Sequence, residues 1–150
     1  MTRGDTSKII IRPAAAEDYQ AIRDVWRKSS LNVCEDGRDG EAAFRRQLEW
    51  YTGLYLVADD AHRIVGVVLG THDRRKGWIN RLAVLPEYRR RGIAARLVTA
   101  CDRAIRRQGI EIVAALVEPQ NHASLRLFEQ LGYSTAVPVT YFRRPDRPGA

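Results

Sequence analysis

The sequence predicts an α/β fold in which a mixed, mostly antiparallel sheet is covered by helices. Three observations carry this prediction: short β-branched runs alternate with longer amphipathic segments, the strands before residue 85 follow one another through turns, and the last segment again has a strand pattern. The chain of 150 residues is long enough for one hydrophobic core. We therefore expect a single domain over residues 1–150, with an ordered core of about 8–144 and a tail at 145–150.

The composition limits the classes of protein to consider. Hydrophobic residues make up 45% of the chain and charged residues 29%, which is ordinary for a globular protein. No apolar run approaches the roughly 18 residues of a membrane span, and residues 1–8 carry no apolar signal segment, so we expect a cytoplasmic protein away from the membrane. The net charge of +7 comes mainly from arginine and indicates an anionic partner. Cys34 and Cys101 are too few for a disulfide framework or a metal site, and we expect no metal.

The first half of the chain predicts a strand, two helices and a hairpin. A β-branched run at 8–13 ends at a proline, and residues 14–30 and 41–51 have helical periodicity. The loop between those helices carries Glu35, Asp36 and Asp39, which would suit a cationic amine. Two further strands are expected, at residues 54–58 and 63–72. Glycines at 66 and 70 in the second of them indicate a close approach of another element.

The second half predicts a central strand, a long helix and a closing region. The central strand covers residues 78–85, and the helix after it ends at Gly109. A buried strand is expected at 111–117 and a helix from Asn121 to about Gly132. Residues 133–144 are expected to supply one or two closing strands.

The stretch from Leu82 to Ala95 is the one with the clearest chemical meaning. A strand stops at Pro86, an arginine-rich loop follows, and Gly92 opens an amphipathic helix. A helix start leaves unpaired N–H groups and partial positive charge, and glycine lets a ligand approach the backbone closely. We therefore predict a site for a phosphate or a diphosphate here. The stretch is not a Walker A loop, because GxxxxGK[ST] is absent.

Two motifs together resemble the GNAT superfamily of N-acetyltransferases. The first is Arg89-x-x-Gly92-x-Ala94, similar to the acyl-CoA-binding pattern Arg/Gln-x-x-Gly-x-Gly/Ala. The second is the segment Asn121 to Tyr133, similar to the family's Asn-x-x-Ala/Ser…Tyr-Glu-x-Leu-Gly-Phe/Tyr segment. The resemblance covers nearly the whole chain. It is nearest to the small single-domain bacterial branch that includes YpeA-like proteins and ribosomal-protein N-terminal acetyltransferases.

The resemblance implies a fold, a cofactor and a set of site residues. The GNAT fold has six to seven strands, splayed at the centre, and about four helices. Acetyl-CoA would be the co-substrate, with its pantetheine arm in the splay and its diphosphate at the helix start. The acceptor would be a primary amine on a small molecule or a protein N-terminus, and family members often form homodimers. The implied cofactor-binding residues are Leu82, Ala83, Val84, Arg89, Arg90, Arg91, Gly92, Ile93, Ala94, Ala95, Asn121, Ser124 and Phe128.

The chain departs from the family where catalysis is concerned. Many members carry a glutamate where this chain has Trp78 or Leu116, and neither of these can take a proton. Asn80 shares a strand face with Trp78 and could orient a water or the substrate. Glu118, just beyond the next strand, is the best carboxylate candidate, although it equally fits a solvated residue near the start of the following helix.

A second departure concerns the acid that protonates the leaving thiolate. Many relatives have tyrosine where this chain has Phe128, and a positioned acid contributes about 10²–10⁴-fold. Tyr133 and Tyr141 could replace it or could be aromatic core residues. The loss should not abolish transfer, because a thiol with a pKa of about 8.5 yields a tolerable leaving group.

Three functions therefore remain open from the sequence. The first is an N-acetyltransferase that works by direct attack in a ternary complex. Without a strong base it would favour an amine of low pKa, because deprotonation at pH 7 costs roughly 4.6 kcal/mol for lysine but only about 1–1.4 kcal/mol for an α-amine. The second is a degenerate GNAT domain that binds acyl-CoA without efficient transfer. The third, less favoured because no nucleic-acid-binding motif is present, is an arginine-rich nucleic-acid binder.

Overall fold

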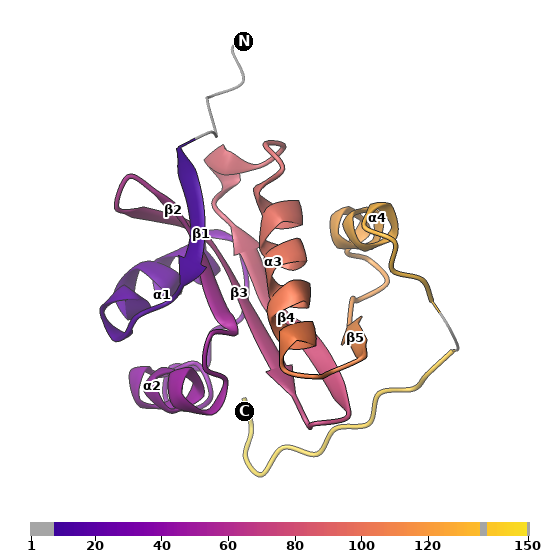
Figure 1. Cartoon of the computed structure of the whole chain (residues 1–150). Coiled ribbons are helices and arrows are strands. Elements are labelled where there is room, and N and C mark those ends of the chain that lie inside the picture. Colours follow the sequence, from indigo (N-terminus) through magenta and orange to yellow (C-terminus); the bar gives the residue numbers. More distant parts are fainter. Residues whose placement is uncertain (1–7, 136–137, 150) are drawn as a thin grey trace.

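A computed structural model describes residues 8–135 and 138–149 of the chain (Figure 1). The described residues form a five-stranded sheet in the order β1-β2-β3-β4-β5, with helices on both faces. The elements in chain order are β1 (Ile9–Pro13), the 3₁₀ helix η1 (Ala16–Asp18), α1 (Tyr19–Lys28), α2 (Glu41–Trp50), β2 (Tyr55–Asp60), β3 (Arg63–His72), β4 (Lys76–Val84), the 3₁₀ helix η2 (Pro86–Tyr88), α3 (Ile93–Arg107), β5 (Ile112–Ala115) and α4 (His122–Gln130).

The sheet is antiparallel up to β4 and parallel at its last pair. β1, β2, β3 and β4 pair in sequence as antiparallel neighbours, whereas β4 and β5 run parallel because α3 crosses over between them. The predicted mixed, mostly antiparallel sheet is thus confirmed.

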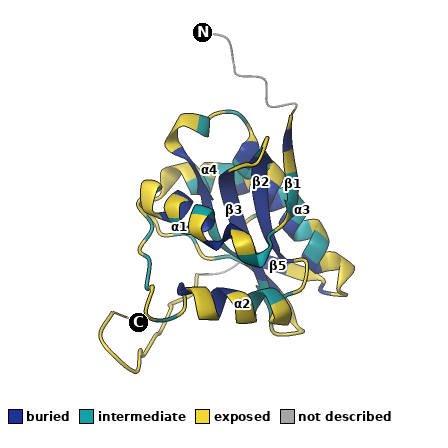
Figure 2. Cartoon of the chain, turned by 90° about the vertical axis from the view of Figure 1, so that its left-hand side faces the viewer, coloured by how far each residue is buried: buried dark blue, intermediate teal, exposed yellow. Residues whose placement is uncertain are grey.

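The two faces of the sheet are covered by different helices. α3 lies across β2, β3 and β4 on one face, and α1 lies against β3 and β4 on the other (Figure 1). Figure 2 shows α1 and α2 in front of the buried strands. Because both faces are covered, β2 and β3 are buried along almost their whole length instead of alternating.

Glycines allow α3 to lie close to the sheet. A Cβ atom on Gly70 would stand 2.8 Å from Cys101 Sγ, and one on Gly77 would stand 2.4 Å from Ile105 Cγ2. The close approach predicted at Gly66 and Gly70 is confirmed, since Gly66 in the same way faces Leu97. Cys101 is fully buried in this contact, and burial raises the pKa of its thiol to about 12. It is therefore a core residue and stays protonated.

A buried ion network joins the start of the first helices to the sheet edge. Arg12 Nη1 lies 2.8 Å from Asp18 Oδ2, and Arg12 Nε lies 2.9 Å from Asp59 Oδ2. Asp18 also accepts a hydrogen bond from Ala15 N at 2.7 Å, and Asp59 accepts one from His62 N at 2.7 Å. The hydrogen bond from Arg12 lowers the pKa of Asp18.

Two predictions about element limits need correction. Ala14 and Ala15 are not helical, because the first helix is entered through the 3₁₀ turn at 16–18, where Asp18 accepts the Ala15 N–H. The strand predicted at 111–117 covers only Ile112–Ala115 and is buried only in part: Val113 lies in the core, whereas Ile112 is exposed. Leu116, just beyond the strand, is exposed as well.

The closing strands predicted at 133–144 are absent from the described part of that segment, and Ala136 and Val137 lie outside the described residues. Pro138 brings no N–H for a strand ladder, and the chain beyond it runs toward the α1–α2 loop, where Arg147 pairs with Asp36. The described sheet thus has five strands instead of the expected six to seven.

No helix among residues 8–135 and 138–149 is both long and apolar enough to cross a membrane.

The ion network makes a prediction about stability. The pKa of Asp18 is lower in the folded than in the unfolded state, so the ionised carboxylate stabilises the fold above about pH 4, and this contribution is lost as the pH falls through the depressed pKa. We expect Asp18→Asn to lower the free energy of unfolding by about 1–3 kcal/mol at pH 7. Urea unfolding from pH 7 to pH 3 should show the difference from the wild type shrinking below about pH 4.

The matched control is Asp24→Asn on the exposed face of α1, which should change stability by no more than about 0.5 kcal/mol at any pH. A difference for Asp18→Asn that stays constant from pH 7 to pH 3 would contradict the assignment.

Candidate active site

The central feature of the site is the point where β4 and β5 separate. The two strands pair only from Lys76↔Ile112 to Ile79↔Ala115, and β4 then continues to Val84 with no strand beside it on that edge in the described residues. The cause is a bulge in β4: Leu69 pairs with Asn80 and Val67 with Ala83, so β4 has one residue more than β3 in this interval. The splay that the family resemblance implied is present.

Backbone N–H groups point into this splay. Leu85 N donates to Val65 O at 2.8 Å, so the Leu85 N–H is directed toward β3. Successive residues of a strand direct their N–H groups to opposite edges, and the N–H groups of Val84 and Leu82 therefore point away from β3. They can donate to an extended ligand that lies along β4.

The start of α3 is a second source of free donors. Gly92, at a φ of 76°, is the N-cap residue, and no side chain caps the helix. The first helical bond runs from Arg96 N to Gly92 O at 3.1 Å, and the N–H groups of residues 90–95 have no acceptor within the described parts of the chain. A Cβ atom on Gly92 would meet nothing within 4 Å. The helix start is thus an open and electropositive mouth.

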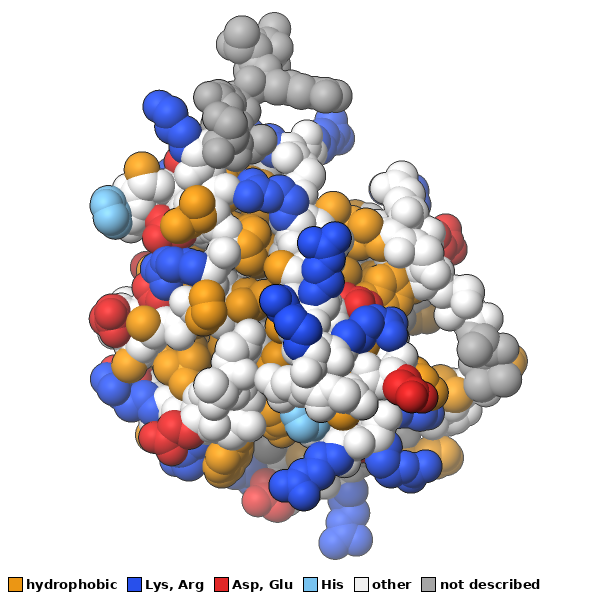
Figure 3. Space-filling view, in the orientation of Figure 1, with side chains coloured by type: hydrophobic (Ala, Val, Ile, Leu, Met, Phe, Trp, Pro, Cys, Tyr) orange, Lys and Arg blue, Asp and Glu red, His pale blue; other side chains and the backbone are white. Residues whose placement is uncertain are grey.

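Arginines surround this mouth. Arg91 donates to Glu87 O at 3.1 Å and stacks on Tyr88, whose hydroxyl donates to Asp60 at 2.6 Å. The side chains of Arg89 and Arg90 are exposed. Figure 3 shows basic side chains spread over the face that α3 covers. These charges favour an anionic ligand at the start of α3.

The start of α4 lies on the far side of the splay from β4. Asn121 Oδ1 accepts a hydrogen bond from Ser124 N at 3.2 Å, which makes Asn121 the cap that the sequence predicted. Phe128 is only 8% exposed and packs edge-on against Tyr133, with ring centroids 5.1 Å apart. Asn121 is exposed and Ser124 is half-buried, whereas Phe128, one turn after Ser124, belongs to the core.

The two candidate catalytic residues have different surroundings. Asn80 is partly buried, and its amide nitrogen donates to Thr71 Oγ1 at 3.0 Å and to Trp78 O at 3.3 Å. These bonds leave its Oδ1 as an acceptor beside the splay. Glu118 is exposed and accepts a hydrogen bond from Gln120 Nε2. Of these two residues, only Asn80 lies on a strand and has a side chain whose orientation is fixed there by hydrogen bonds.

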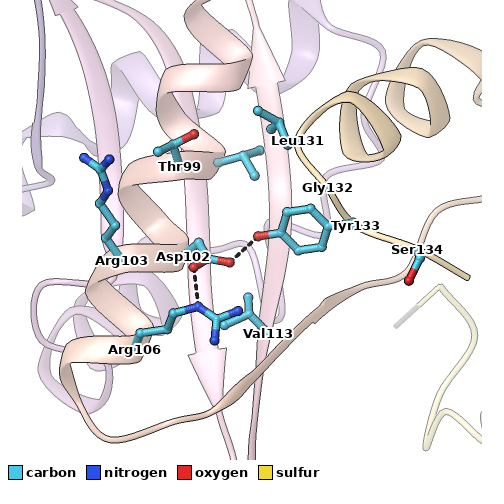
Figure 4. Close-up of a pocket in the computed structure, with 10 residues that line it drawn as sticks. Thr99, Asp102, Arg103, Arg106, Val113, Leu131, Gly132, Tyr133 and Ser134 are labelled. Atoms are coloured by element: carbon cyan, nitrogen blue, oxygen red, sulfur yellow. Dashed lines mark hydrogen bonds and ion pairs between the residues drawn. The ribbon is translucent and has the colours of Figure 1, made fainter. Parts of the chain in front are cut away.

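The hydroxyl of Tyr133 is bound to a residue of α3. This hydroxyl donates to Asp102, which also lies 2.6 Å from Arg106 Nε (Figure 4). Burial, together with this hydrogen bond, raises the pKa of Tyr133.

Tyr133, Asp102 and Arg106 border a cavity of about 480 Å³ between α3, β5 and the segment after α4. Among the candidate site residues named from the sequence, Tyr133 lines this cavity, and the predicted cofactor-binding residues, Asn80 and Glu118 do not. Tyr141 is 70% exposed.

The acidic residues of the α1–α2 loop are all paired with arginines. Glu35 contacts Arg27 and lies 3.7 Å from Arg23, while Asp36 lies 3.0 Å from Arg147. Asp39 is buried and lies 3.4 Å from Arg81. The sequence had indicated that these acids would suit a cationic amine; each of them already lies beside an arginine, although Asp36 stays 78% exposed.

A contact between β4 and the α1–α2 loop was not identified from the sequence. The structure brings Arg81 of β4 to Asp39, with its guanidinium 4.5 Å from the centre of the Trp26 ring. Neither partner could be found from spacing, since both contacts join distant parts of the chain.

Comparisons with known proteins agree with this geometry. The model of the acetyltransferase (GNAT) family matches residues 19–133. Acetyltransferase ECA0875 of Pectobacterium atrosepticum is 30% identical over 134 residues, which is 89% of this chain and 94% of that protein. This chain belongs to the GNAT acetyltransferase family.

Solved structures show the same fold. Ard1 from Thermoplasma volcanium superposes with a TM-score of 0.76 at 20% identity, covering 87% of this chain and 85% of that one. The PaiA N-acetyltransferase from Thermoplasma acidophilum, solved in complex with coenzyme A, superposes with a TM-score of 0.74 at 19% identity, covering 84% and 89%. The predicted GNAT fold is confirmed.

The contacts of Tyr133 make a prediction about its role. We expect Tyr133→Phe to lower the free energy of unfolding by about 0.5–1.5 kcal/mol, since one hydrogen bond to Asp102 is lost. The pH dependence of acetyl transfer should stay that of the wild type, because the hydroxyl takes no part in it. A rate at least tenfold lower with unchanged stability would instead identify Tyr133 as the acid that protonates the thiolate.

Proposed function

We propose that this protein transfers the acetyl group of acetyl-CoA to a primary amine, on a protein N-terminus or a small molecule, by direct attack in a ternary complex. The observation that supports this best is the uncapped start of α3 next to an unpaired edge of β4. The start of α3 and the edge of β4 each offer N–H donors with no partner in the described chain. Together they match a ligand in which an anionic group is joined to an extended chain. Membership of the GNAT family supports the same assignment.

Coenzyme A fits the residues that are present. The N–H groups of residues 90–95 and the arginines at 89–91 would hold the diphosphate, with Gly92 leaving room for it. The pantetheine arm would lie along the edge formed by Leu82, Ala83 and Val84. Asn121 and Ser124 would border the thioester end, with Phe128 packed behind them.

The chemistry asked of the chain is positioning and polarisation. Acetyl-CoA, when bound, supplies an activated acyl group as a thioester. The Val84 N–H is directed to donate to the carbonyl oxygen where negative charge develops. Asn80 Oδ1 is the acceptor that would orient an N–H of the incoming amine.

Proton transfer falls to water in this proposal. Trp78, Leu116 and Phe128 cannot exchange protons, Glu118 is exposed to solvent, and the hydroxyl of Tyr133 is bound to Asp102. An amine that is already partly neutral near pH 7 is then the better acceptor, which favours a protein or peptide N-terminus over a lysine side chain.

The same facts support a second candidate, a GNAT domain that binds acyl-CoA without efficient transfer. Incubation with acetyl-CoA and a panel of small amines, lysine and N-terminal peptides separates the two. Acetylated product, measured by mass spectrometry, supports the transferase. Binding of coenzyme A in calorimetry with no product from any acceptor supports the second candidate.

The open space at Gly92 gives a test of the cofactor site. We expect Gly92→Ala to weaken coenzyme A binding at least tenfold in calorimetry, because its Cβ atom would project into the mouth that receives the diphosphate. The left-handed backbone at Gly92 should also cost about 1–2 kcal/mol of stability.

Gly109→Ala is the matched control. Gly109 lies at the other end of α3, at a φ of 87°, with equally open space around its Cβ position. It should lose a similar amount of stability and keep the affinity of the wild type. Equal affinities for the two variants would remove the support for a diphosphate site at Gly92.

A second prediction concerns the residues beside the acetyl group. Asn80→Ala should lower kcat with the preferred amine by about 10-fold or more, since positioning of the nucleophile is lost, while Glu118→Gln should stay within about 3-fold of the wild type. The wild-type rate should keep rising up to pH 9–10 as more free amine becomes available. A plateau governed by a group near pH 6–7 and abolished in Glu118→Gln would identify Glu118 as the base instead.

A further inference from the structure

Arg81 occupies an unfavourable position at the bulge of β4. Its φ of 55° lies in the left-handed region, which is strained for a residue other than glycine. Its side chain is only 19% exposed and crosses to the face of the sheet covered by α1, over Trp26 and beside Asp39. Burial lowers the pKa of the guanidinium.

The polar atoms of this cluster are not well satisfied. Arg81 Nε and Nη2 are buried, and neither has a hydrogen-bond partner among the described residues, although Nη2 lies within ion-pair distance of Asp39. Trp26 Nε1 is likewise buried with no partner in that part of the chain. Buried donors that lack an acceptor destabilise a fold, so the cluster is a poor solution for stability alone.

Asp39 is the point around which the end of the α1–α2 loop folds. Its carboxylate accepts a hydrogen bond from Cys34 N at 2.9 Å, and its carbonyl oxygen accepts one from Tyr19 Oη at 2.9 Å. A contact that holds Asp39 in place therefore also holds this end of the loop in place. Arg81 is the residue that joins Asp39 to the sheet.

The start of the same loop is attached to β4 as well. Ser29, directly after α1, donates from its hydroxyl to Val84 O at 3.1 Å. The loop is thus attached to β4 at two residues, Arg81 and Val84. These two residues bound the stretch whose outer edge carries the N–H groups of Leu82 and Val84. These contacts set the place of the loop relative to the edge on which the thioester would lie.

We propose that Arg81 is a positioning residue that holds the α1–α2 loop, residues 29–40, in register with the β4 edge, at a cost in folding stability. The inference rests on the proposed function, since it takes this loop as one wall of the acceptor site. The loop acids are neutralised by arginines, so the position of the wall and its backbone groups, and not its charge, selects the amine.

The test is a double variant, Arg81→Met with Asp39→Asn. Either change alone leaves a buried charge without its partner and should lower Tm, whereas the double variant removes both charges, keeps an acceptor for Cys34 N, and should melt at or above the wild-type temperature. We expect the KM for the amine to rise at least tenfold and the KM for acetyl-CoA to stay within twofold. Arg81→Lys, which keeps the charge but loses the planar contact with Trp26, should raise the KM for the amine by a smaller factor.

A second measurement does not depend on activity. The amide protons of Gly37 and Gly40 are bonded within the loop, to Cys34 O and Gly37 O. Their hydrogen exchange should be at least tenfold faster in the double variant, while exchange in β2 stays unchanged. The control Glu41→Gln with Arg45→Met removes an exposed pair from α2 and the same charges, and should change none of these quantities.

The possible failures are distinct. If the double variant is stable and both the KM for the amine and the exchange of Gly37 and Gly40 equal those of the wild type, the role of Arg81 is refuted. The same holds if the double variant is as unstable as the single variants, because the pair would then serve stability. If the wild type acetylates no amine, the proposed function fails, and the exchange rates still decide whether Arg81 holds the loop.

Discussion

The structure depends on how the backbone N–H and C=O groups of β4 beyond Ile79 find hydrogen-bond partners. Up to that residue β4 is paired on both edges, and beyond it β5 has ended while β4 continues. The bulge at Arg81 makes this separation permanent, because one additional residue in β4 bends the strand away. An unpaired strand edge inside a protein is costly unless something donates to or accepts from it. In the function that we propose, an extended ligand pairs with this open edge.

Most of the fold could be predicted from the sequence because its information is local. Periodicity and turn residues placed the helices at 41–50 and 93–107 and the strand at 63–72 within a few residues of their observed limits. The glycines of β3 indicated a close neighbour before that neighbour was known. The C-terminal region was not predictable in this way. An alternating apolar pattern shows that a segment can form a strand, but the segment forms one only where the edge of another strand is free to pair with it.

The same distinction applies to the site. The helix start at Gly92 was evident from a strand, a proline and a glycine in order, and the cap at Asn121 from its position before a helix. The pairing of Arg81 with Asp39 and that of Tyr133 with Asp102 were not, because each joins residues that only the folded chain brings together. The ion pairs of the α1–α2 loop were not predictable either. Its carboxylates are evident in the sequence, but the arginines that face them are not.

The contrast between the two thiols of the chain has a practical consequence. Cys101 is sealed beneath α3, whereas Cys34 is partly exposed on the α1–α2 loop. A maleimide or other alkylating dye should therefore label the native protein at one position, on the loop that we propose as a wall of the acceptor site. Fluorescence from that dye would report changes in the surroundings of the loop in solution without any engineered cysteine.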